Sequence, residues 1–332
     1  MRPIRVLVAD GETSGPFWGR VRRLADTRRF ELLAPEGEGE EELAALAREA
    51  EAILVYKRPL RGEVIGGARN CRLIQKFGVN CKNIDLAAAR RAGIPVETLS
   101  LMRNATVAEQ AMALLLACIR KLLPGHRAVA EGLYRERGLT PRPTAQWSFA
   151  GDWAGLGAGE LFGKTAGIIA LGDIGQALAR RCRAFEMEVI YHQRTPLPPE
   201  QERALGVRYC GKEELLRASD ALLLVVPHTP ETEGLIGAAE LSLMKPTAFL
   251  VNCARGAVVD EDALAAALRA GRLAGAGLDV FRWEPLPADS PLLSAPNLVL
   301  SPHVGGGSGS SWGRDIPAAF ENIARCLGQQ DA

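Results

Sequence analysis

Long apolar runs are missing from this sequence. A helix that crosses a bilayer needs about 20 predominantly apolar residues, whereas the longest strongly apolar stretch here, Ala111–Ile119, lies between Glu109 and Arg120. The first residues run directly into a strand pattern, without the apolar leader and small-residue cleavage site of a secretory signal. We therefore expect no membrane as a partner and a cytoplasmic location.

An excess of charge of one sign is also missing. The chain contains 40 Lys and Arg residues and 39 Asp and Glu residues, which gives a formal net charge of +1. This balance provides no general positive field to attract a phosphate backbone, so nucleic acid is not an expected partner. Hydrophobic residues make up 47% and charged residues 24% of the chain, proportions that favour a globular protein over a disordered one.

Paired cysteines are absent as well. None of the seven cysteines belongs to a C-x-x-C motif or has a histidine at the spacing of a metal site. We expect the thiols to be reduced and mostly structural, and we expect no metal. No short repeat recurs along the chain, which excludes solenoids and propellers. The cysteines are Cys71, Cys81, Cys118, Cys182, Cys210, Cys253 and Cys326.

Short β-branched or Leu-rich runs alternate with helical patterns along the whole chain. This alternation is typical of parallel sheets whose strands are connected by helices, so the predicted class is α/β. At roughly 100–200 residues per domain, the length favours two domains. The first expected strands are Ile4–Ala9, Phe30–Ala34, Ala52–Tyr56, Leu73–Phe77 and Pro95–Thr98. The second series is Ala166–Leu171, Glu188–His192, Ala221–Val226, Ala248–Asn252, Gly277–Val280 and Leu298–Leu300. Expected helices include Glu41–Ala50, Leu86–Ala92, Gln176–Phe185 and Asp315–Leu327.

A long helix from Thr106 to about Leu123 is expected between the two series of strands. It leads into Gly125–Lys164, which is rich in Gly, Pro and Arg and carries Trp147 and Trp153. We interpret this segment as an arm that lies outside the domain cores. Its aromatic residues pack either on a partner subunit or on their own domain, and the sequence leaves both alternatives open.

A glycine-rich turn opens the second series of strands. The first strand runs into Gly172, Asp173, Ile174 and Gly175, and a helix and another strand follow. In such a βαβ unit, bare glycine backbone lets the pyrophosphate of a dinucleotide approach the free N–H groups of the helix N-terminus. We predict that these four residues bind a nicotinamide cofactor. The alternative, a tight turn that binds nothing, is less favoured because the βαβ context is complete.

Two residues of this turn depart from the G-x-G-x-x-G pattern. Ala170 occupies the first glycine position, and Asp173 adds a negative charge close to the expected phosphates. If the backbone at position 170 has a positive φ, alanine costs about 1 kcal/mol there. Both departures are expected to weaken cofactor binding without preventing it.

The end of the following strand indicates which nicotinamide cofactor is used. NAD-binding proteins place Asp or Glu about 20 residues beyond the glycine turn, where it binds the ribose hydroxyls. Here Gln193, Arg194 and Thr195 occupy that region. No carboxylate is therefore present to repel the 2′-phosphate of NADP, and Arg194 and Thr195 can bind that phosphate. We predict that NADP is preferred and NAD is possible; the alternative is that Arg194 stacks on adenine while either cofactor is accepted.

Three residues late in the chain suit the reduction of a 2-oxo acid. Arg255, Glu284 and His303 each follow the end of an expected strand, the edge where open α/β sheets bind ligands. Arg255 suits the polarisation of a carbonyl, and His303 suits its protonation while hydride arrives. Glu284 would orient the imidazole and stabilise its protonated form. Taken singly, they could be a surface ion pair, a solvated loop residue and a turn histidine.

Together with the glycine turn, these residues resemble the D-2-hydroxyacid dehydrogenase family, in particular glyoxylate/hydroxypyruvate reductases and phosphoglycerate dehydrogenase-like enzymes. The resemblance covers nearly the whole chain. It also includes the segments 77–80, 83–85, 106–109 and 227–232. The function that it implies is hydride transfer between NAD(P)H and a small 2-oxo or 2-hydroxy acid, with D-specificity.

The resemblance implies a discontinuous domain arrangement. Residues 1–103 and 305–332 would form a flavodoxin-like substrate domain, and residues 104–304 a Rossmann-like dinucleotide-binding domain. Both would be doubly wound parallel sheets. The helix at 106–122 would pair two subunits into a homodimer.

The resemblance also implies further site residues. Backbone N–H groups of Gly78 and Val79 would hold the substrate carboxylate, and Asp279 would contact the nicotinamide carboxamide. The cofactor would also contact Pro227, Thr232 and Cys253. This chain departs from the family in the substrate loop at Asn80–Lys82, which leaves the substrate's identity open.

Arg58 is a further candidate for substrate binding, because Lys57 and Arg58 follow the strand Ala52–Tyr56. A basic pair facing the substrate would favour a second anionic group, whereas the alternative is a solvated pair at a strand end.

A different class of function remains open from the sequence. The resembled family includes transcriptional corepressors, so the chain could be an NAD(P)-sensing regulator on the same scaffold. It shows no recruitment segment beyond the fold, which favours the enzyme.

Overall fold

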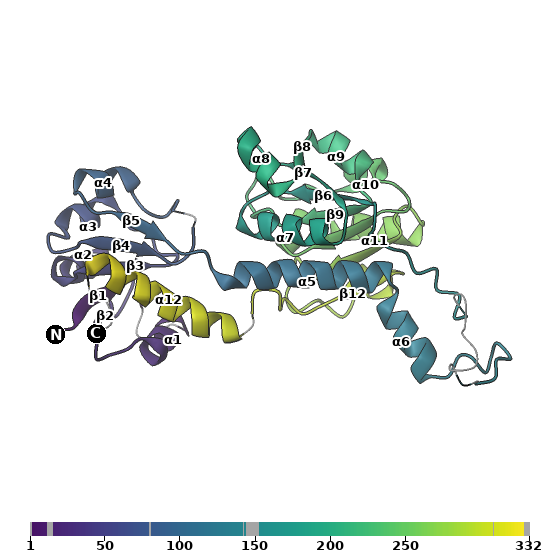
Figure 1. The fold of residues 1–332 in the computed structure, drawn as a ribbon, viewed down its shortest axis with the longest axis horizontal. Coiled ribbons are helices and arrows are strands. Elements are labelled where there is room, and N and C mark those ends of the chain that lie inside the picture. Colours follow the sequence, from purple (N-terminus) through teal and green to yellow (C-terminus); the bar gives the residue numbers. More distant parts are fainter. Residues whose placement is uncertain are drawn as a thin grey trace. The chain divides into compact units, whose positions relative to one another are not determined.

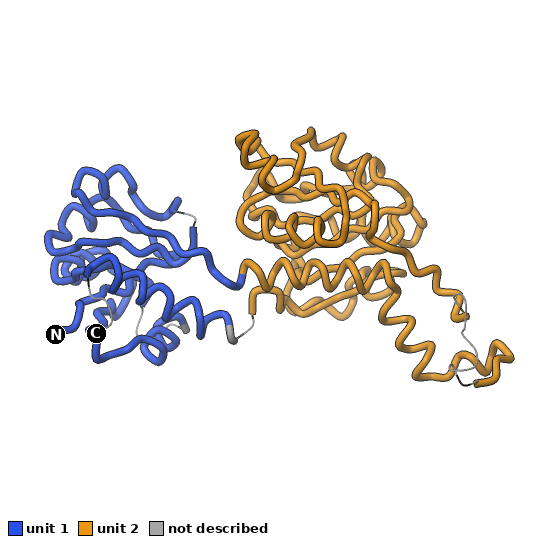
Figure 2. The backbone as a smooth tube through the Cα atoms, in the orientation of Figure 1, with its two compact units in different colours: residues 1–103, 308–332 blue, residues 104–307 orange. Residues whose placement is uncertain are grey.

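Two parallel sheets organise the chain, as the sequence predicts. The computed structural model describes residues 2–11, 16–79, 81–141, 143, 153–307 and 309–328. Two compact units, 1–103 with 308–332 and 104–307, are coloured separately in Figure 2. In each unit, helices cover both faces of a sheet (Figure 1).

The first unit has a five-stranded parallel sheet in the order β2-β1-β3-β4-β5. Alternate residues of β1 enter two different apolar clusters, Val6 and Val8 on one face and Leu7 on the other. Helices α2, α3 and α4 cover one face, and α1 and α12 cover the other. The strands are β1 Ile4–Val8, β2 Phe30–Leu33, β3 Ala52–Val55, β4 Leu73–Lys76 and β5 Val96–Thr98. The helices are α1 Pro16–Leu24, α2 Glu40–Glu49, α3 Gly62–Gly67, α4 Leu86–Arg91 and α12 Gly309–Leu327.

The order of these strands creates a switch point. β1 pairs with β2 on one side and with β3 on the other, so the connections after β1 and β2 leave to opposite sides. In open α/β sheets, ligands bind in the crevice at the carboxyl ends of such neighbouring strands. In this unit the crevice lies at the carboxyl ends of β1 and β3.

The second unit has a seven-stranded parallel sheet in the order β12-β11-β10-β9-β6-β7-β8. One face packs on α5 and α7, and the other on α9, α10 and α11. The strands are β6 Thr165–Ile169, β7 Glu188–His192, β8 Arg208–Tyr209, β9 Ala221–Leu224, β10 Phe249–Asn252, β11 Gly275–Leu278 and β12 Leu298–Leu300. The helices are α5 Met102–Ile119, α6 Leu122–Ala130, α7 Asp173–Ala184, α8 Pro199–Leu205, α9 Lys212–Ala218, α10 Ala238–Leu243 and α11 Glu261–Arg269, with 3₁₀ turns η1 Gly256–Val258 and η2 Pro291–Ser294.

The long helix expected from Thr106 to Leu123 is two helices. α5 ends at Ile119, Lys121 adopts a positive φ of 53°, and α6 begins at Leu122. The cause is Pro124, which lacks an N–H and would clash with the carbonyl four residues earlier in a continuous helix. A proline is tolerated in the first turn of a new helix, so the chain restarts the helix in a new direction.

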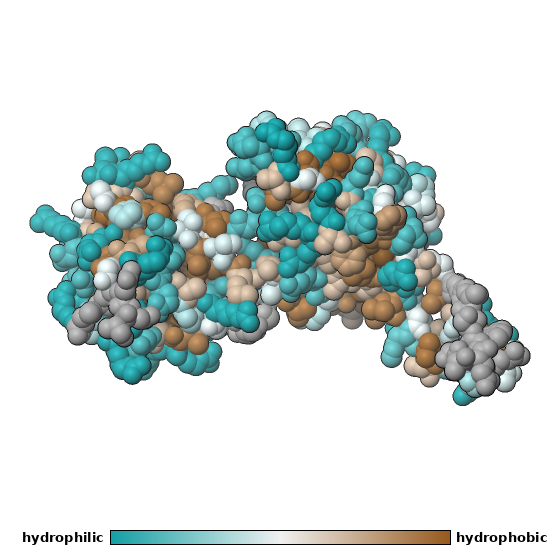
Figure 3. Space-filling view, viewed as in Figure 1, coloured by the Kyte–Doolittle hydropathy of each residue, from teal (hydrophilic) through white to brown (hydrophobic). Residues whose placement is uncertain are grey.

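Helix α6 projects from the sheet of its unit (Figure 1). Leu122, Leu123 and Val129 on this helix are exposed, as is Phe162 shortly before β6. Figure 3 shows apolar surface over α6. Trp147, one of the two arm tryptophans, lies outside the described residues.

The last helix begins earlier than expected, at Gly309 instead of Asp315. Trp312, Ile316, Phe320 and Ile323 recur at helical spacing and pack in the core of the first unit, which extends the helix through a Gly- and Ser-rich stretch.

The two-residue strand β8 gave no periodic signal in the sequence. None of the helices in the described ranges is long and apolar enough to cross a membrane.

Candidate active site

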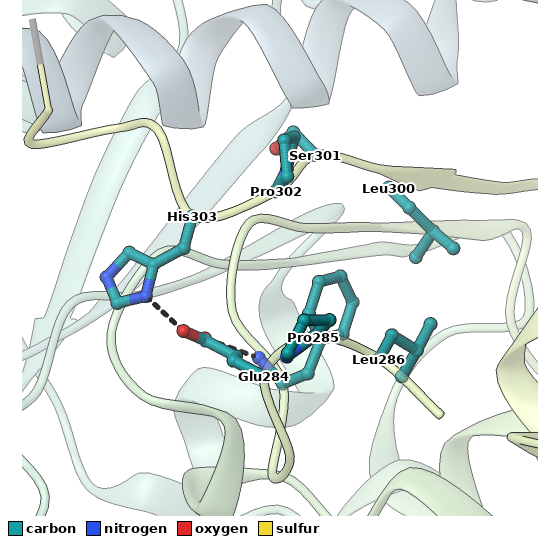
Figure 4. Close-up of a pocket in the computed structure, with 8 residues that line it drawn as sticks. Glu284, Pro285, Leu286, Leu300, Ser301, Pro302 and His303 are labelled. Carbon is teal, nitrogen blue, oxygen red and sulfur yellow. Dashed lines mark hydrogen bonds and ion pairs between the residues drawn. The ribbon is translucent and has the colours of Figure 1, made fainter. Parts of the chain in front are cut away.

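His303 and Glu284 form a hydrogen-bonded pair at the carboxyl edge of the seven-stranded sheet (Figure 4). Their Nδ1 and Oε2 atoms are 2.6 Å apart. The other carboxylate oxygen, Oε1, accepts a hydrogen bond from the Phe281 N–H at 3.1 Å, which fixes the carboxylate from behind. Because Nδ1 is occupied by Glu284, Nε2 is the imidazole nitrogen available to a substrate.

The charge of Glu284 is set by opposing effects. Burial alone would raise the pKa of Glu284, but the hydrogen bonds from His303 and from the Phe281 N–H, with the charges of His303 and Arg255, outweigh burial. The pKa of Glu284 therefore lies below its usual value. The carboxylate remains negative at neutral pH and can stabilise a protonated imidazole.

Arg255 enters the site from a loop that follows β10. The buried Asn252 holds this loop, since its Oδ1 accepts from the Ala254 N–H at 3.0 Å and its Nδ2 donates to the Arg255 carbonyl at 3.0 Å. Gly256 is required next, because a Cβ there would lie 1.8 Å from the carbonyl carbon of Phe281. Because Gly256 has no side chain, the loop that carries Glu284 can approach the loop of Arg255. The Arg255 side chain is exposed, and its charge acts on Glu284.

Asp279 anchors the loop that carries His303. It is 2% exposed, and its Oδ1 accepts hydrogen bonds from the Ser301 hydroxyl at 2.6 Å and the Val304 N–H at 3.1 Å. Its Oδ2 accepts from the Gly305 N–H at 2.8 Å. Both carboxylate oxygens thus have partners within the unit, and the expected contact with a nicotinamide carboxamide stays a prediction.

The backbone at His303 is strained. Its φ of 53° lies in the left-handed region, which costs an L residue about 1–2 kcal/mol. The bonds of Asp279 on either side hold this conformation, and Gln110 on α5 adds a hydrogen bond to the Ser301 hydroxyl at 2.8 Å. Gln110, Ser301 and Asn252 are positioning residues that sequence reasoning missed, because a polar residue on a helix or at a strand end carries no motif.

A pocket of about 460 Å³ lies against the dyad. Figure 4 shows that its side chains come from the loop after β11 and from the end of β12. Apart from Glu284, His303 and Ser301, the lining is apolar. The lining residues are Phe281, Glu284, Pro285, Leu286, Leu300, Ser301, Pro302 and His303.

The glycine turn has the geometry of a phosphate-binding loop. Gly172 precedes α7, the helix has no side-chain cap, and a Cβ at Gly172 would meet nothing within 4 Å. A Cβ at Gly175 would lie 2.2 Å from the carbonyl oxygen of Ala170, so only glycine allows the helix to pack this closely on the strand. Because no side chain at Gly172 stands in front of the start of α7, an anionic group can approach the N-terminus of this helix, where the N–H of Ile174 lies.

Asp173 is half-buried in this turn. Burial raises the pKa of its carboxyl, and a hydrogen bond from Asn104 Nδ2 at 3.1 Å partly opposes the increase. A carboxylate here disfavours a neighbouring phosphate, as the sequence suggests.

Ala170 adopts a φ of 73°. The turn thus requires a positive φ at the position where the sequence pattern places glycine, and alanine carries a strain of about 1–2 kcal/mol.

Replacing Ala170 by glycine is expected to leave the free energy of unfolding unchanged or to raise it by up to about 1.5 kcal/mol, because the relieved strain exceeds the entropy that glycine adds to the unfolded chain. Ala266, exposed on α11, is the matched control: Ala266→Gly should lower the free energy of unfolding by about 1 kcal/mol. Urea denaturation of both variants measures the difference. Equal destabilisation by the two substitutions would contradict the interpretation.

The residues expected around the ribose lie together after β7. Gln193 accepts a hydrogen bond from the Leu171 N–H at 3.0 Å and donates to the Thr195 carbonyl at 2.7 Å, so it links the glycine turn to the next loop. Arg194 and Thr195 are exposed, and Arg194 lies near enough to Glu231 to help lower the pKa of that carboxyl, although a hydrogen bond from Thr229 is the larger cause.

Three other expected cofactor residues follow β9 and β10. The Thr232 hydroxyl donates to the Pro227 carbonyl at 2.8 Å and accepts from the Thr229 N–H at 2.7 Å, which closes this loop. Cys253 is buried, and burial raises the pKa of its thiol well above the usual value. The thiol of Cys253 is therefore uncharged at neutral pH.

The expected substrate residues belong to the first unit. Gly78 has a φ of 117° and Val79 is 42% exposed; Asn80 lies outside the described residues. The guanidinium of Arg58 already donates to the carbonyls of Ala9, Gly37 and Gly39 at 3.1–3.3 Å. For Arg58 this geometry favours a structural role, and its contact with a substrate stays a prediction.

Comparison with known proteins places these features in one family. A family model described as D-isomer specific 2-hydroxyacid dehydrogenase, NAD binding domain, matches residues 112–305. The glyoxylate reductase of Pyrococcus furiosus is 41% identical over 281 residues, which are 83% of this chain and 80% of that protein. The D-3-phosphoglycerate dehydrogenase of Archaeoglobus fulgidus is 37% identical over 276 residues, 83% of this chain and 49% of that protein.

Solved structures agree with these relatives. The structure of an NADPH-dependent glyoxylate/hydroxypyruvate reductase from Sinorhizobium meliloti, in complex with NADP and malonate, aligns over 100% of this chain and 96% of that one. Its TM-score is 0.63 at 30% sequence identity. An acyclic imino acid reductase in complex with NADPH and D-Arg covers 99% of both chains, with a TM-score of 0.62 at 26% identity.

Proposed function

The chain belongs to the family of D-isomer specific 2-hydroxyacid dehydrogenases, and from this premise we propose how its residues perform the reaction. It is an NAD(P)-dependent enzyme that transfers a hydride between the nicotinamide and a 2-oxo or 2-hydroxy acid. The observation that supports the assignment of roles is the Glu284–His303 pair with Arg255, in the same unit as the uncapped glycine turn. We assign D-specificity from the family description.

The residues of the turn fit a dinucleotide. Gly172 leaves room for a pyrophosphate, and the N-terminus of α7 supplies N–H groups and the positive end of a helix dipole. When bound, the cofactor supplies or accepts the hydride. In reduction, Arg255 binds and polarises the carbonyl, and protonated His303 donates its proton from Nε2 to the carbonyl oxygen. Glu284 stabilises the imidazolium until that transfer.

Glyoxylate and hydroxypyruvate are the proposed substrates, because they are named for the relatives. Gly78 and Val79 would hold the carboxylate through backbone N–H groups. The test is oxidation of NADPH and NADH with a panel of 2-oxo acids. Tight cofactor binding without turnover of any member would favour the regulator instead.

NADPH is the proposed preferred cofactor. Gln193 is neutral and engaged with the backbone, so no carboxylate repels a 2′-phosphate, and exposed Arg194 can bind it. Hydrogen bonds to charged groups contribute about 1.5–3 kcal/mol, so kcat/KM should be about ten- to a hundredfold higher with NADPH. Arg194→Ala should abolish this preference.

The control for Arg194→Ala is Arg203→Ala, which removes an exposed arginine from α8. It should leave the ratio of kcat/KM with the two cofactors unchanged. A wild-type enzyme that prefers NADH, or an Arg194→Ala variant with no selective loss for NADPH, would contradict the proposal.

Glu284→Gln is expected to move the pH profile of reduction downward. The low pKa of Glu284 means that a negative carboxylate faces His303 throughout the neutral range. A neutral amide stabilises the imidazolium less, so the proton-donating form is lost at a lower pH as pH rises. The pH dependence of kcat/KM for glyoxylate measures the shift, and an unmoved profile would show that Glu284 does not act on the proton donor.

A homodimer paired through α5 and the neighbouring α6 is also proposed. The exposed apolar side chains of Leu122, Leu123 and Val129 support it, because a partner would cover them. Light scattering in solution tests the oligomeric state. The cytoplasmic location stays a prediction.

A further inference from the structure

A loop at residues 193–198 connects β7 to α8 (Figure 1) and carries Arg194 and Thr195, the residues proposed to bind the 2′-phosphate. Both side chains are exposed. Within the described part of the chain, no hydrogen bond or ion pair holds the Arg194 guanidinium. The position of these two side chains therefore depends on how the backbone of the loop is held.

The hydroxyl of Tyr191 holds the far end of this loop. Tyr191 lies on β7 and is fully buried, with its ring in the apolar core of the second unit. Its Oη accepts a hydrogen bond from the Leu197 N–H at 2.7 Å. The same hydroxyl donates to Oε1 of Glu202, in the first turn of α8, at 2.6 Å. One phenolic hydroxyl thus fixes both the loop and the start of the next helix.

The direction of these two bonds follows from the protonation state of Tyr191. Burial is the largest cause that raises the pKa of its hydroxyl, and the hydrogen bond to Glu202 raises it further, to about 12. The hydroxyl is therefore protonated at neutral pH. Its proton goes to Glu202, because the N–H of Leu197 can only donate.

The near end of the loop is held by Gln193, whose side chain bonds to the glycine turn and back to its own loop. Only residues 194–196 lie between this anchor and the one at Leu197. A proline has little freedom in its own φ, and Pro196 restricts this short segment further. The two anchors thus leave the backbone of Arg194 little freedom.

A fixed loop matters for the cofactor that uses Arg194. A flexible loop loses conformational entropy when a ligand orders it, which weakens binding. NADPH differs from NADH only by the 2′-phosphate, the group assigned to Arg194 and Thr195. Loosening of the loop therefore weakens the binding of NADPH selectively. The chemistry at His303 takes place at the nicotinamide, the other end of the cofactor.

We propose that Tyr191 is a positioning residue for cofactor selectivity, whose hydroxyl fixes the loop so that Arg194 and Thr195 bind the 2′-phosphate of NADPH. The proposal rests on the proposed function, which assigns the phosphate to these two residues. Tyr191 is buried and acts only through the loop. Loss of its hydroxyl raises KM for NADPH and leaves kcat unchanged.

The test compares Tyr191→Phe with Tyr209→Phe in steady-state kinetics with glyoxylate and either cofactor. Tyr209 is the matched control, because its ring lies 5.5 Å from that of Tyr191 and its hydroxyl forms no hydrogen bond among the described residues. Tyr191→Phe should raise KM for NADPH about five- to tenfold, with kcat and the KM for NADH nearly unchanged. Tyr209→Phe should leave all of these values unchanged.

Two substitutions of Glu202 test the other partner of the hydroxyl. Glu202→Gln keeps an oxygen that accepts from Tyr191 and should resemble wild type. Glu202→Ala removes the acceptor and should raise KM for NADPH about two- to fivefold. The effect is smaller than in Tyr191→Phe, because the hydroxyl still accepts from Leu197. This pair of variants keeps the proposal testable if Tyr191→Phe fails to fold.

Two further measurements do not depend on turnover. Fluorescence titration with NADPH and with NADH gives the selectivity as a ratio of Kd values. Amide hydrogen exchange at Leu197 reports on the loop in the protein alone. This exchange should be about tenfold faster in Tyr191→Phe than in wild type, because the N–H loses its acceptor, and it should be unchanged in Tyr209→Phe.

Several results would overturn the role of Tyr191 while wild type still prefers NADPH. These are an unchanged cofactor ratio in Tyr191→Phe, an equal loss for both cofactors, unchanged exchange at Leu197, or the same effects in Tyr209→Phe. An equal loss would indicate a purely structural role. A wild type that binds NADH at least as tightly as NADPH would instead contradict the assignment of the 2′-phosphate to Arg194, and the role of Tyr191 would fail with it.

Discussion

Replacing His303 by alanine is expected to lower kcat/KM for 2-oxo acid reduction by at least about a hundredfold, the scale for removing a general acid. The reason is geometric. Glu284 occupies Nδ1 at 2.6 Å and leaves Nε2 for the substrate oxygen, so no other group of the dyad carries a transferable proton. Cofactor affinity should barely change, which fluorescence titration with NADPH measures beside the steady-state rates.

The left-handed backbone at His303 calls for a second variant. Alanine is strained at a φ of 53°, whereas asparagine tolerates that region better. His303→Asn should therefore lose activity as His303→Ala does while it retains more stability. His126→Ala, an exposed histidine on α6, serves as the control with normal activity. Near-normal turnover by either His303 variant would remove this residue from the mechanism.

The strand pattern was the part of the fold most directly visible in the sequence. Buried parallel strands such as β10 contain short apolar runs, and the carboxyl ends of β10, β11 and β12 bring Arg255, Glu284 and His303 to one edge. Elements whose formation depends on their neighbours were less visible. β8 has two residues, and the start of α12 is helical because Trp312 packs in the first unit's core.

The site shows the same division. Reactive residue types at strand ends could be recognised, because their chemistry is specific and their position follows from topology. The contacts that support these residues could not be recognised from the sequence. Asn252 holds the Arg255 loop, and Gln110 reaches the Ser301 hydroxyl across 191 residues of sequence. The Arg58 guanidinium donates hydrogen bonds to three backbone carbonyls of its own unit. These carbonyls belong to loops whose conformation no sequence motif predicts.

Backbone strain at Ala170 could be predicted from the sequence, whereas the strain at His303 could not. Ala170 was suspect because a glycine pattern surrounds it, and its φ of 73° confirms the concern. His303 carried no such pattern, yet it has the same kind of conformation. Strain at a reactive residue is held by the contacts around it, here the bonds of Asp279 to Val304 and Gly305.

Arg255→Ala is expected to lower kcat/KM for 2-oxo acid reduction by at least about a hundredfold, because a positioned donor that stabilises developing negative charge contributes on that scale. Arg255 is exposed on a loop that Asn252 and Gly256 fix, so the variant should keep its fold and its affinity for NADPH. Arg255→Lys restores the charge without the planar fork and should fall between wild type and alanine. The effect is therefore one of geometry as well as charge.

Steady-state kinetics with glyoxylate, fluorescence titration with NADPH and thermal unfolding separate these contributions. Arg272→Ala, which removes an exposed arginine just after α11, is the matched control and should behave as wild type in all three measurements. An Arg255→Ala variant that keeps kcat/KM would show that another cation polarises the carbonyl. A variant that loses NADPH binding to the same extent as activity would instead assign Arg255 to the cofactor, since a group that acts only on the reacting carbonyl leaves cofactor affinity unchanged.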